Sequence, residues 1–466
     1  MNRLSGPAIA APVLCLLASS VVSADWIGNW QWDKINCDAP WTRRAGLQVV
    51  ESDGAFYLMG GRTARPPMDP PIPGDSDIWS DVWKSTDQGA TWEQLLESDG
   101  AHWPARAYFR ALTKGEEMFV LGGQNFIVIP NPKCPPPYVD CNPFLSVSEF
   151  FNDVWSSTDG VNWTELTSEA GWSGRAGLSA IVFNDEIYVI GGSYLDDDAI
   201  IGGPPLRIYY NDVWKSSDGV NWTQLVEEAP FAPRAGAALA VKDGYIYLFG
   251  GEEGFLCEGF PFCDLPYFND VWRTANGVDW ELVTETSAWQ ARPGHQVVVA
   301  DDQFVLFGGF GASTDPQDPF GPGNPMDCWV STDGAEWNLL QTVPWNAVEP
   351  IQIKYDFAAL ATQVDTPEQG EVTAIFTFGG DRETFNFFDP FNYLNIDNDV
   401  WRFSTQINSC TGDLNGDSRV DGADITMLLC TWGAVMDGME HVDLNGDQII
   451  DGRDLTILLA AWGPCS

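Results

Sequence analysis

The stretch EIYVIGG (residues 186–192), followed by NDVWKSSDGVNW (residues 211–222), decides the fold of this chain. A short apolar run ending in Gly-Gly recurs six times, and each copy is followed by an SDVW, NDVW or MDCW segment, at spacings of 57 to 72 residues. The Gly-Gly pairs stand at residues 60–61, 122–123, 191–192, 250–251, 308–309 and 379–380. Self-similarity at such a period is the signature of a repeat architecture, so the repeats are the units of the fold.

Each repeat predicts four short strands separated by turns. In the third copy these are RAGLSAIVF (175–183), the run that ends in Gly-Gly, NDVWKS (211–216) and NWTQLV (221–226). Alternating apolar residues bounded by Gly, Asp and Asn favour strands over helices. Six such sheets arranged radially form a β-propeller, which protects the strand edges by repetition. We therefore predict an all-β, six-bladed propeller.

The ends of the repeat region predict how the ring closes. The sixth repeat has no fourth strand after Trp401, whereas GNWQWDKI (28–35) matches GVNWTQLV (219–226) of the third repeat. We expect this N-terminal segment to supply the missing strand.

The Arg, Gly-Gly and NDVW pattern resembles the kelch-repeat family across residues 25–407. The turn STDQGATW (85–92) also resembles the Asp-box of sialidases, which are six-bladed propellers. We favour a structural role for this turn, because Asp87 can accept backbone N–H bonds and Gly89 relaxes the backbone.

Composition and the N-terminus narrow the function classes. The 466 residues include 23 Lys and Arg against 66 Asp and Glu, a net charge of −43, which argues against binding to nucleic acid or anionic membrane. Residues 1–24 read as a signal peptide with Arg3, an apolar core and a Val22-Ser23-Ala24 cleavage site, and no later segment is long enough to span a membrane. We expect a secreted protein, extracellular or at the cell surface.

Export permits disulfides among the nine cysteines that follow the signal peptide. Loop positions favour the pairs Cys134–Cys141, Cys257–Cys263 and Cys410–Cys465. The pairing of Cys37, Cys328 and Cys430 stays open, with Cys430 interpreted as a small core residue because it aligns with Ala460.

The basic residues near the start of the six repeats, with the aromatic residues before them, form the candidate ligand site of the propeller. An aromatic residue precedes an Arg by three positions in five blades, and alignment places Lys354 in the sixth. These residues would lie on the face that carries the long loops after Gly-Gly, where Arg over an aromatic wall suits acidic or sugar-like ligands. The alternative is that both residue types are part of the repeat consensus, with Arg fixing loops and Trp packing between blades. The candidate residues are Arg44, Arg106, Arg175, Arg234, Arg292, Lys354, Trp41, Trp103, Trp172 and Trp289.

Residues 408–466 change character and predict two calcium-binding loops, each followed by an apolar helix. DLNGDSRVDGAD (413–424) and DLNGDQIIDGRD (443–454) place oxygen ligands at loop positions 1, 3, 5, 9 and 12, with a main-chain carbonyl at position 7, as a calcium loop requires. The ligands for two ions are Asp413, Asn415, Asp417, the Arg419 carbonyl, Asp421 and Asp424 in the first loop, and Asp443, Asn445, Asp447, the Ile449 carbonyl, Asp451 and Asp454 in the second.

This duplicated loop and helix resembles a type I dockerin, an EF-hand-like α-helical module. The resemblance implies calcium binding, a cohesin-like scaffold partner and a place in extracellular polysaccharide breakdown. Ser418 and Gln448 replace the usual Gly at position 6, and Gly422-Ala423 and Gly452-Arg453 replace Ser/Thr positions that often contact cohesin. Calcium binding is therefore the firmer implication of the two.

Three functions follow from these modules. The leading hypothesis is a non-catalytic recognition component that binds an acidic or neutral glycan. The alternatives are a glycoside hydrolase or polysaccharide lyase with carboxylates in the loop face, which leaves the catalytic residues unknown, and a structural surface component.

Overall fold

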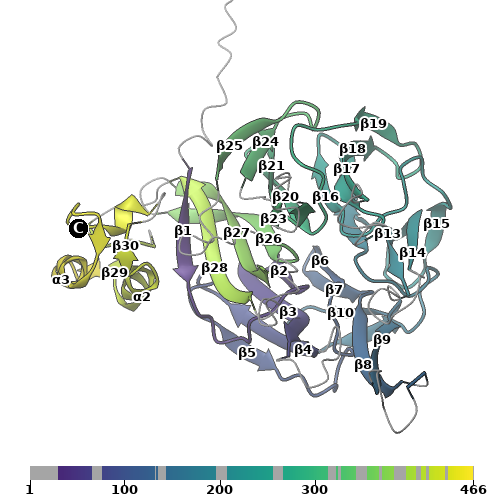
Figure 1. Ribbon diagram of the computed structural model, residues 1–466, viewed down its shortest axis with the longest axis horizontal. Helices are drawn as coiled ribbons and strands as arrows, with labels where there is room; N and C mark the ends of the chain where they lie inside the picture. The colour runs from purple at the N-terminus through teal and green to yellow at the C-terminus, as the bar shows by residue number, and fades with distance from the viewer. Residues whose placement is uncertain are drawn as a thin grey trace, which may run out of the picture.

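The computed structural model confirms the six-bladed β-propeller and the small C-terminal module (Figure 1). It describes residues 30–65, 76–131, 133–134, 143–195, 207–254, 266–312, 322–323, 327–342, 354–366, 370–382, 395–405, 411–415, 419–435 and 439–464. The predicted signal peptide lies outside these residues. None of the helices in the described residues is long and apolar enough to cross a membrane.

Each blade is an antiparallel four-stranded sheet. The first three blades consist of β2 (Gln48–Ser52), β3 (Ala55–Ala64), β4 (Ser76–Ser85) and β5 (Glu93–Leu96); β6 (Arg110–Lys114), β7 (Glu117–Leu121), β10 (Val154–Ser157) and β11 (Thr164–Thr167); and β12 (Ser179–Phe183), β13 (Glu186–Tyr194), β14 (Ile208–Ser216) and β15 (Thr223–Val226). The others consist of β16 (Ala238–Lys242), β17 (Tyr245–Glu252), β18 (Tyr267–Thr274) and β19 (Glu281–Thr284); β20 (His295–Ala300), β21 (Gln303–Gly308), β24 (Asp327–Ser331) and β25 (Asn338–Thr342); and β26 (Ala358–Thr366), β27 (Gly370–Asp381), β28 (Ile396–Thr405) and β1 (Trp30–Asn36).

The predicted closure of the ring is confirmed. The N-terminal strand β1 pairs antiparallel with β28, and Trp30 stands opposite Thr405 while Lys34 stands opposite Trp401. One blade thus joins strands from the two ends of the propeller sequence, so the ring is closed by backbone hydrogen bonds (Figure 1).

The Gly-Gly pairs mark where the second strand of a blade approaches the backbone of the next blade. In the third blade the register of β13 against β14 shifts between Ile190 and Gly192, a β-bulge. Gly191 has a φ of +60°, and a Cβ there would come within 2.6 Å of the Arg234 carbonyl oxygen of the next blade. Only glycine fits this close backbone approach, which explains why the pair recurs.

The Asp-box turns are structural caps of the strand ends, as expected. Asp159 Oδ1 accepts hydrogen bonds from the backbone N–H groups of Val161 (2.8 Å) and Asn162 (2.7 Å). The hydrogen bond from the Asn162 N–H is the main reason why the pKa of Asp159 falls to about 2, and Asp218 shows the same arrangement and the same shift.

Two of the connections after Gly-Gly hold a strand pair of their own in the described residues. β8 (Gln124–Pro130) and β9 (Phe144–Phe150) form a hairpin in the second blade, and β22 (Gly311–Ala312) pairs with β23 (Pro322–Gly323) in the fifth. The sequence indicated long loops after Gly-Gly, and this hairpin lies within one of them.

The C-terminal module holds two short helices, α2 (Gly422–Cys430) and α3 (Gly452–Ala460). Each begins with a capping box, centred on Asp421 and Asp451. Short strand pairs and a 3₁₀ turn complete it: β29 (Arg419–Val420) with β32 (Gly463–Pro464), β30 (Gly433–Ala434) with β31 (Ile449–Ile450), and η3 (Glu440–Val442).

The module lies at the rim of the ring, beside the outer strand β1 (Figure 1). Its buried side chains Leu414, Val420 and Met427 join one continuous apolar core with Trp30 and Trp32 of β1. The reason is hydrophobic burial, because β1 has no further blade outside it to cover its side chains.

The cysteines pair differently from the expectation in one case. Cys430 is not a core residue but forms a disulfide with Cys37, which follows β1. Cys134 is disulfide-bonded, whereas its expected partner Cys141 lies outside the described residues, as do Cys257, Cys263, Cys410 and Cys465. Cys328 is a free, fully buried thiol.

Candidate functional site

The six basic residues expected to bind a ligand are buried and bind the protein itself. At most 1% of each is exposed to solvent. Each forms an ion pair with the Asp of the NDVW-type segment in its own blade, and we call these the spoke pairs. They are Arg44–Asp81, Arg106–Asp153, Arg175–Asp212, Arg234–Asp270, Arg292–Asp327 and Lys354–Asp399.

The third blade shows how fully a spoke arginine is used. Arg175 donates from Nη1 and Nη2 to the two oxygens of Asp212, at 2.6 and 3.0 Å. Its Nη1 also donates to the Gly191 carbonyl (2.9 Å), and its Nε to the Ser173 carbonyl (3.0 Å). Trp214 of the NDVW segment donates its indole N–H to Asp212 as well. The planar guanidinium thus links the blade entry, the Gly-Gly bulge and the third strand.

The aromatic residues that precede the spoke arginines are equally buried. Trp41, Trp103, Trp172 and Trp289 are at most 1% exposed. Each packs edge-to-face on the tryptophan of an Asp-box turn, with ring centroids 5.9 to 6.3 Å apart; the pairs are Trp41–Trp92, Trp103–Trp163, Trp172–Trp222 and Trp289–Trp337. These contacts favour the structural alternative for both residue types, because a ligand would have to displace buried side chains from the protein groups that they contact.

A different set of residues lies at the channel mouth, around the propeller axis. Each blade contributes one residue, two positions after its spoke Arg or Lys, to a closed ring of six. The backbone N–H of each ring residue donates to the carbonyl oxygen of the ring residue in the preceding blade, at 2.7 to 3.2 Å. This axial ring consists of Gly46, Tyr108, Gly177, Gly236, Gly294 and Asp356. The residue after each Gly-Gly pair lies next to this ring. In five blades it forms an isolated β-bridge with the residue that stands, in the sequence, between the spoke residue and the axial-ring residue.

Asp356 and its surroundings are the most perturbed part of this mouth. Burial raises the pKa of Asp356 to about 7, and the negative charge of Asp381 adds to the shift, while Arg62 opposes it. Arg62 donates to the Tyr108 hydroxyl (2.6 Å) and to Asp381 (2.5 Å). Sequence reasoning missed these residues, although one signal was available: they occupy positions at which the six repeats differ.

The second predicted calcium loop is described in full and is held by its own side chains. Asp443 accepts the N–H groups of Gly446, Asp447 and Gln448, at 2.7 to 3.2 Å. Asp454 accepts those of Asn445 and Asp451. Both loops bring their position-12 carboxylates, Asp424 and Asp454, to full burial.

The first loop has the same arrangement where it can be compared. Asp424 accepts the N–H groups of Leu414, Asn415 and Asp421, and Asp413 is fully buried. Asp417 lies outside the described residues. Among the residues that are described, no three His, Cys, Asp or Glu side chains are grouped closely enough to hold a metal ion. The donor set nevertheless consists only of oxygens, which is the chemistry that calcium prefers.

A buried ionic cluster joins the module to β1. Arg402 of β28 donates to Asp33 of β1 (2.8 Å) and to the Asn415 carbonyl in the first calcium loop. His441 Nε2 lies 2.8 Å from the other oxygen of Asp33. Burial alone would raise the pKa of Asp33, but the charges of His441 and Arg402 outweigh it and hold this pKa below its usual value.

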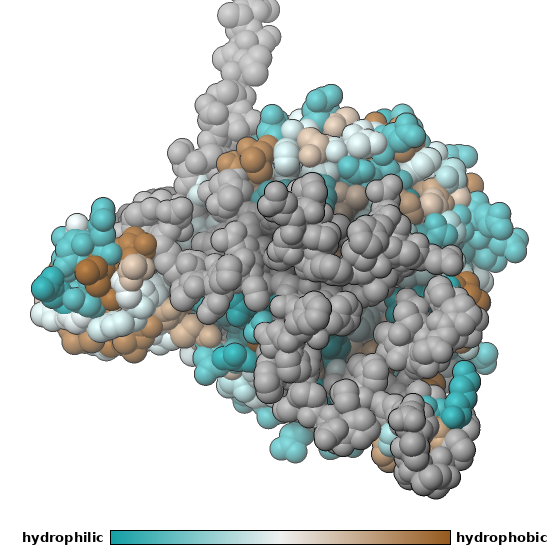
Figure 2. Space-filling view, in the orientation of Figure 1, coloured by the Kyte–Doolittle hydropathy of each residue, from teal (hydrophilic) through white to brown (hydrophobic). Residues whose placement is uncertain are grey.

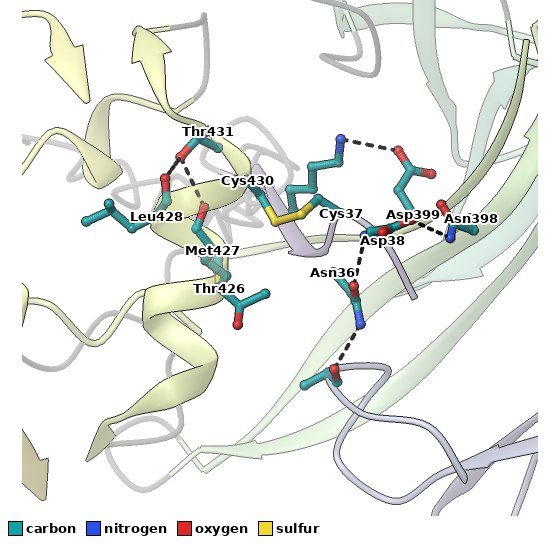
Figure 3. The surroundings of a disulfide bond; sticks show 12 residues. Asn36, Cys37, Asp38, Asn398, Asp399, Thr426, Met427, Leu428, Cys430 and Thr431 are labelled. Carbon is teal, nitrogen blue, oxygen red and sulfur yellow. Dashed lines mark hydrogen bonds and ion pairs between the residues drawn. A yellow bond between two sulfur atoms is a disulfide. The ribbon is translucent and has the colours of Figure 1, made fainter. Parts of the chain in front are cut away.

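The disulfide between Cys37 and Cys430 lies at the end of α2 (Figure 3). Cys37 and Cys430 are 393 positions apart in the chain, and their bond connects the closing strand to the module. The turn around Cys37 is fixed by the side chain of Asn36, which accepts the Asp38 N–H and donates to the Ala90 carbonyl.

Comparison with known proteins identifies the module. The family "Dockerin type I domain" matches residues 411–461. The C-terminal module is a type I dockerin domain. Dockerin domains bind cohesins, and type I dockerins bind calcium; proteins that contain them are typically extracellular or attached to the cell surface.

The dockerin-bearing chain also resembles a solved structure. The structure entitled "Structure of YjhT" is 17% identical over 78% of this chain and 96% of its own, with a TM-score of 0.51. At this identity the likeness supports the propeller fold and nothing about the ligand.

Proposed function

We propose that this protein is a secreted, dockerin-bearing recognition component of extracellular polysaccharide breakdown, in which a kelch-like propeller binds a glycan and the dockerin binds a cohesin-like scaffold. The observation that carries the proposal is the position of the dockerin at the rim of the propeller. The channel mouth and the outer face of the dockerin are thus separate surfaces, which lets one chain hold a scaffold and a ligand together.

The surface of the dockerin supports a protein partner. Apolar side chains gather on this module (Figure 2), and they come in two copies 30 residues apart. Leu429 lies in the last turn of α2 and Trp432 follows this helix, while Leu459 and Trp462 hold the same places at α3; each is 49 to 53% exposed. Large apolar side chains exposed in a repeated arrangement on an acidic protein are typical of an interaction surface.

Calcium is expected to organise this surface. Two ions would be held by the oxygens at positions 1, 3, 5, 7, 9 and 12 of the loops, and the capping boxes show that the position-9 and position-12 side chains already begin each helix. Metal binding of this kind is coupled to folding, because the carboxylates repel one another without the cation.

Calorimetric titration of the full chain with a panel of cohesin modules tests the scaffold role. We expect binding in calcium, loss of binding in EGTA, and at least tenfold weaker binding of Trp432→Ala/Trp462→Ala. Val161→Ala, on an exposed turn of the propeller, is the control. Absence of binding to every cohesin in calcium would remove the scaffold role.

A glycan array tests the propeller, and it must be paired with a turnover assay. Asp356 favours the alternative enzyme, since a carboxyl with a pKa of about 7 suits a general acid. Binding without release of reducing ends or unsaturated sugars supports recognition. Turnover that is lost in Asp356→Asn would replace recognition with hydrolase or lyase activity.

A further inference from the structure

The six repeats are nearly identical in their scaffold and differ at two positions that meet at the channel mouth. One is the axial ring; the other is the residue after each Gly-Gly. The latter are Arg62, Gln124, Ser193, Glu252, Phe310 and Asp381. One backbone geometry accommodates all of these side chains, so the fold does not dictate which is present.

At two positions of the axial ring, the residue that is present costs stability. All six ring residues have a left-handed backbone, with φ between +51° and +66°. Four are glycine, which adopts this conformation freely, whereas Tyr108 (φ +56°) and Asp356 (φ +51°) are not. A tyrosine in this region is uncommon and strained. Glycine would serve the ring at both positions, so their side chains call for another explanation.

The side chains of the first, second and sixth blades form a polar sector. The Tyr108 ring lies over Gly46, where an added Cβ would be 3.1 Å from it. Its hydroxyl accepts from Arg62, which also donates to Asp381. Asp356 extends toward Gly294, with Oδ1 2.7 Å from where a Cβ would stand. Donors and acceptors therefore line one side of the mouth.

An aromatic sector lies beside it. Phe310, the residue after Gly-Gly in the fifth blade, is half-buried and packs edge-to-face on Tyr355 and Tyr267, with centroids 5.4 and 6.1 Å away. Sites for small molecules combine such aromatic surface with a few placed polar groups.

We propose that this channel mouth binds a neutral oligosaccharide, with the C–H face of one sugar on Phe310 and its hydroxyls on Tyr108, Arg62 and Asp356. The inference rests on the proposed function, that the propeller recognises a glycan, and it names the site and the ligand class.

The charges of the mouth select a neutral ligand over a uronate. The guanidinium of Arg62 forms an ion pair with Asp381. Each spoke arginine is buried and paired with an Asp of its own blade. Glu252 adds negative charge and Asp356 adds hydrogen-bonding oxygens, so each cation named here already has a carboxylate partner and none is left to bind a uronate. Vicinal sugar hydroxyls can both donate to the carboxylates and accept from Arg62 and Tyr108.

The test uses the full chain in calcium with three neutral probes, cellohexaose, xylohexaose and mannohexaose, and with trigalacturonate as the acidic probe. We expect one neutral probe to bind and trigalacturonate not to bind. Tyr108→Phe should weaken that binding about tenfold and Phe310→Ala by more. Tyr245→Phe, at the opposite end of its strand from Gly-Gly, is the matched control and should bind as the parent does.

The outcomes separate the two claims. If a neutral probe binds but both mouth variants match the parent, while their melting temperatures are unchanged, the site is wrong and glycan recognition stands. A preference for trigalacturonate would overturn the ligand class. If no glycan on an array or among the probes binds the parent, the proposed recognition role fails together with the site.

Discussion

Two kinds of buried Arg–Asp pair hold this molecule together, and they do so at different levels. The spoke pair Arg175–Asp212 connects strands within one blade and is repeated around the ring. The pair Arg402–Asp33 occurs at one place, where the outer strand meets the dockerin. The chemistry is the same, a guanidinium donating to a buried carboxylate. The position in the fold decides whether the pair supports the propeller or the attachment of a second module.

The comparison teaches how a repeat protein gains an asymmetric feature. All six blades have a neighbouring blade on both sides, and each has an outer strand with no further propeller strand beyond it. Only β1 carries Trp30, Trp32 and Asp33 with a cysteine beyond its end, so only this strand offers an apolar surface, a carboxylate and a thiol together. The dockerin is attached there by three kinds of contact, of which the ionic cluster is one.

The largest effect should come from breaking a spoke. Asp212→Asn removes the charge that balances Arg175, which is 1% exposed, and an unpaired buried charge costs about 3–5 kcal/mol. We expect a lower free energy of unfolding of the propeller in urea, with the glycan affinity of the remaining folded protein unchanged. Glu165→Gln, exposed on β11 of the neighbouring second blade, is the control.

The arginine side of the same spoke separates structure from recognition. Arg175→Lys keeps the charge and loses the planar fork, so melting should fall without any change in ligand binding. If the melting temperature stays unchanged while glycan binding weakens, the spoke arginines are ligand-binding residues and the structural interpretation is wrong.

The disulfide should rank second. Cys37→Ser/Cys430→Ser removes a cross-link between positions 393 apart, and loss of a native disulfide typically costs about 2–4 kcal/mol. Since Cys37 follows β1, we expect faster hydrogen exchange in β1 as well as in α2, that is, loosening of the ring closure together with the dockerin. Exchange that rises in α2 alone would show that the disulfide holds only the module. Cys328→Ser is unsuitable as a control because Cys328 is buried in the core.

The ionic cluster should have a smaller and more local effect. Arg402→Gln removes the donor to Asp33 and to the first calcium loop, while the disulfide still holds the dockerin against β1. We expect a loss of about 1–3 kcal/mol, and exchange should rise around residues 411–415 with the other blades unaffected. Arg43→Gln, 60% exposed at the same edge, should change neither quantity.

Much of the fold was predictable because it is written in local, repeated signals. Gly191 and Gly192 mark the bulge, Asp212 and Trp214 mark the third strand, and the match of residues 28–35 to the third repeat predicted the closing strand. Asp413 and Asp443 stand at fixed spacings that indicate a calcium loop. Each of these signals acts within a few residues of the structure that it specifies.

The site was less predictable because burial and long-range pairing are not local. Arg175 has the same sequence neighbours whether its guanidinium faces a ligand or Asp212, and only the structure places it inside. Cys37 and Cys430 carried no spacing that could connect them. The channel mouth was visible only as variation at Tyr108 and Asp356 against glycine in the other repeats, a signal that gains meaning once the ring of hydrogen bonds is known.

The last prediction concerns how the free energy of unfolding depends on pH. It compares a buried carboxyl that is paired with a cation, Asp327, with one that is not, Asp356. Asp327 faces Arg292: burial pushes its pKa up, but the hydrogen bonds and charge of Arg292 prevail and lower it. Its stabilisation is present above the unfolded pKa of about 3.9 and is lost as the pH falls through the folded value.

Asp356 behaves in the opposite way, since its pKa is raised to about 7. The folded state keeps a proton that the unfolded chain releases, so this carboxyl lowers stability as the pH rises from about 4 to 7. Asp356→Asn should therefore match the parent near pH 4 and exceed its free energy of unfolding by about 1–3 kcal/mol at pH 8, where the parent carries the buried charge. Urea unfolding at both pH values measures the difference; an equal gain at pH 4 and pH 8 would show that relief of backbone strain, and not ionisation, separates the two proteins.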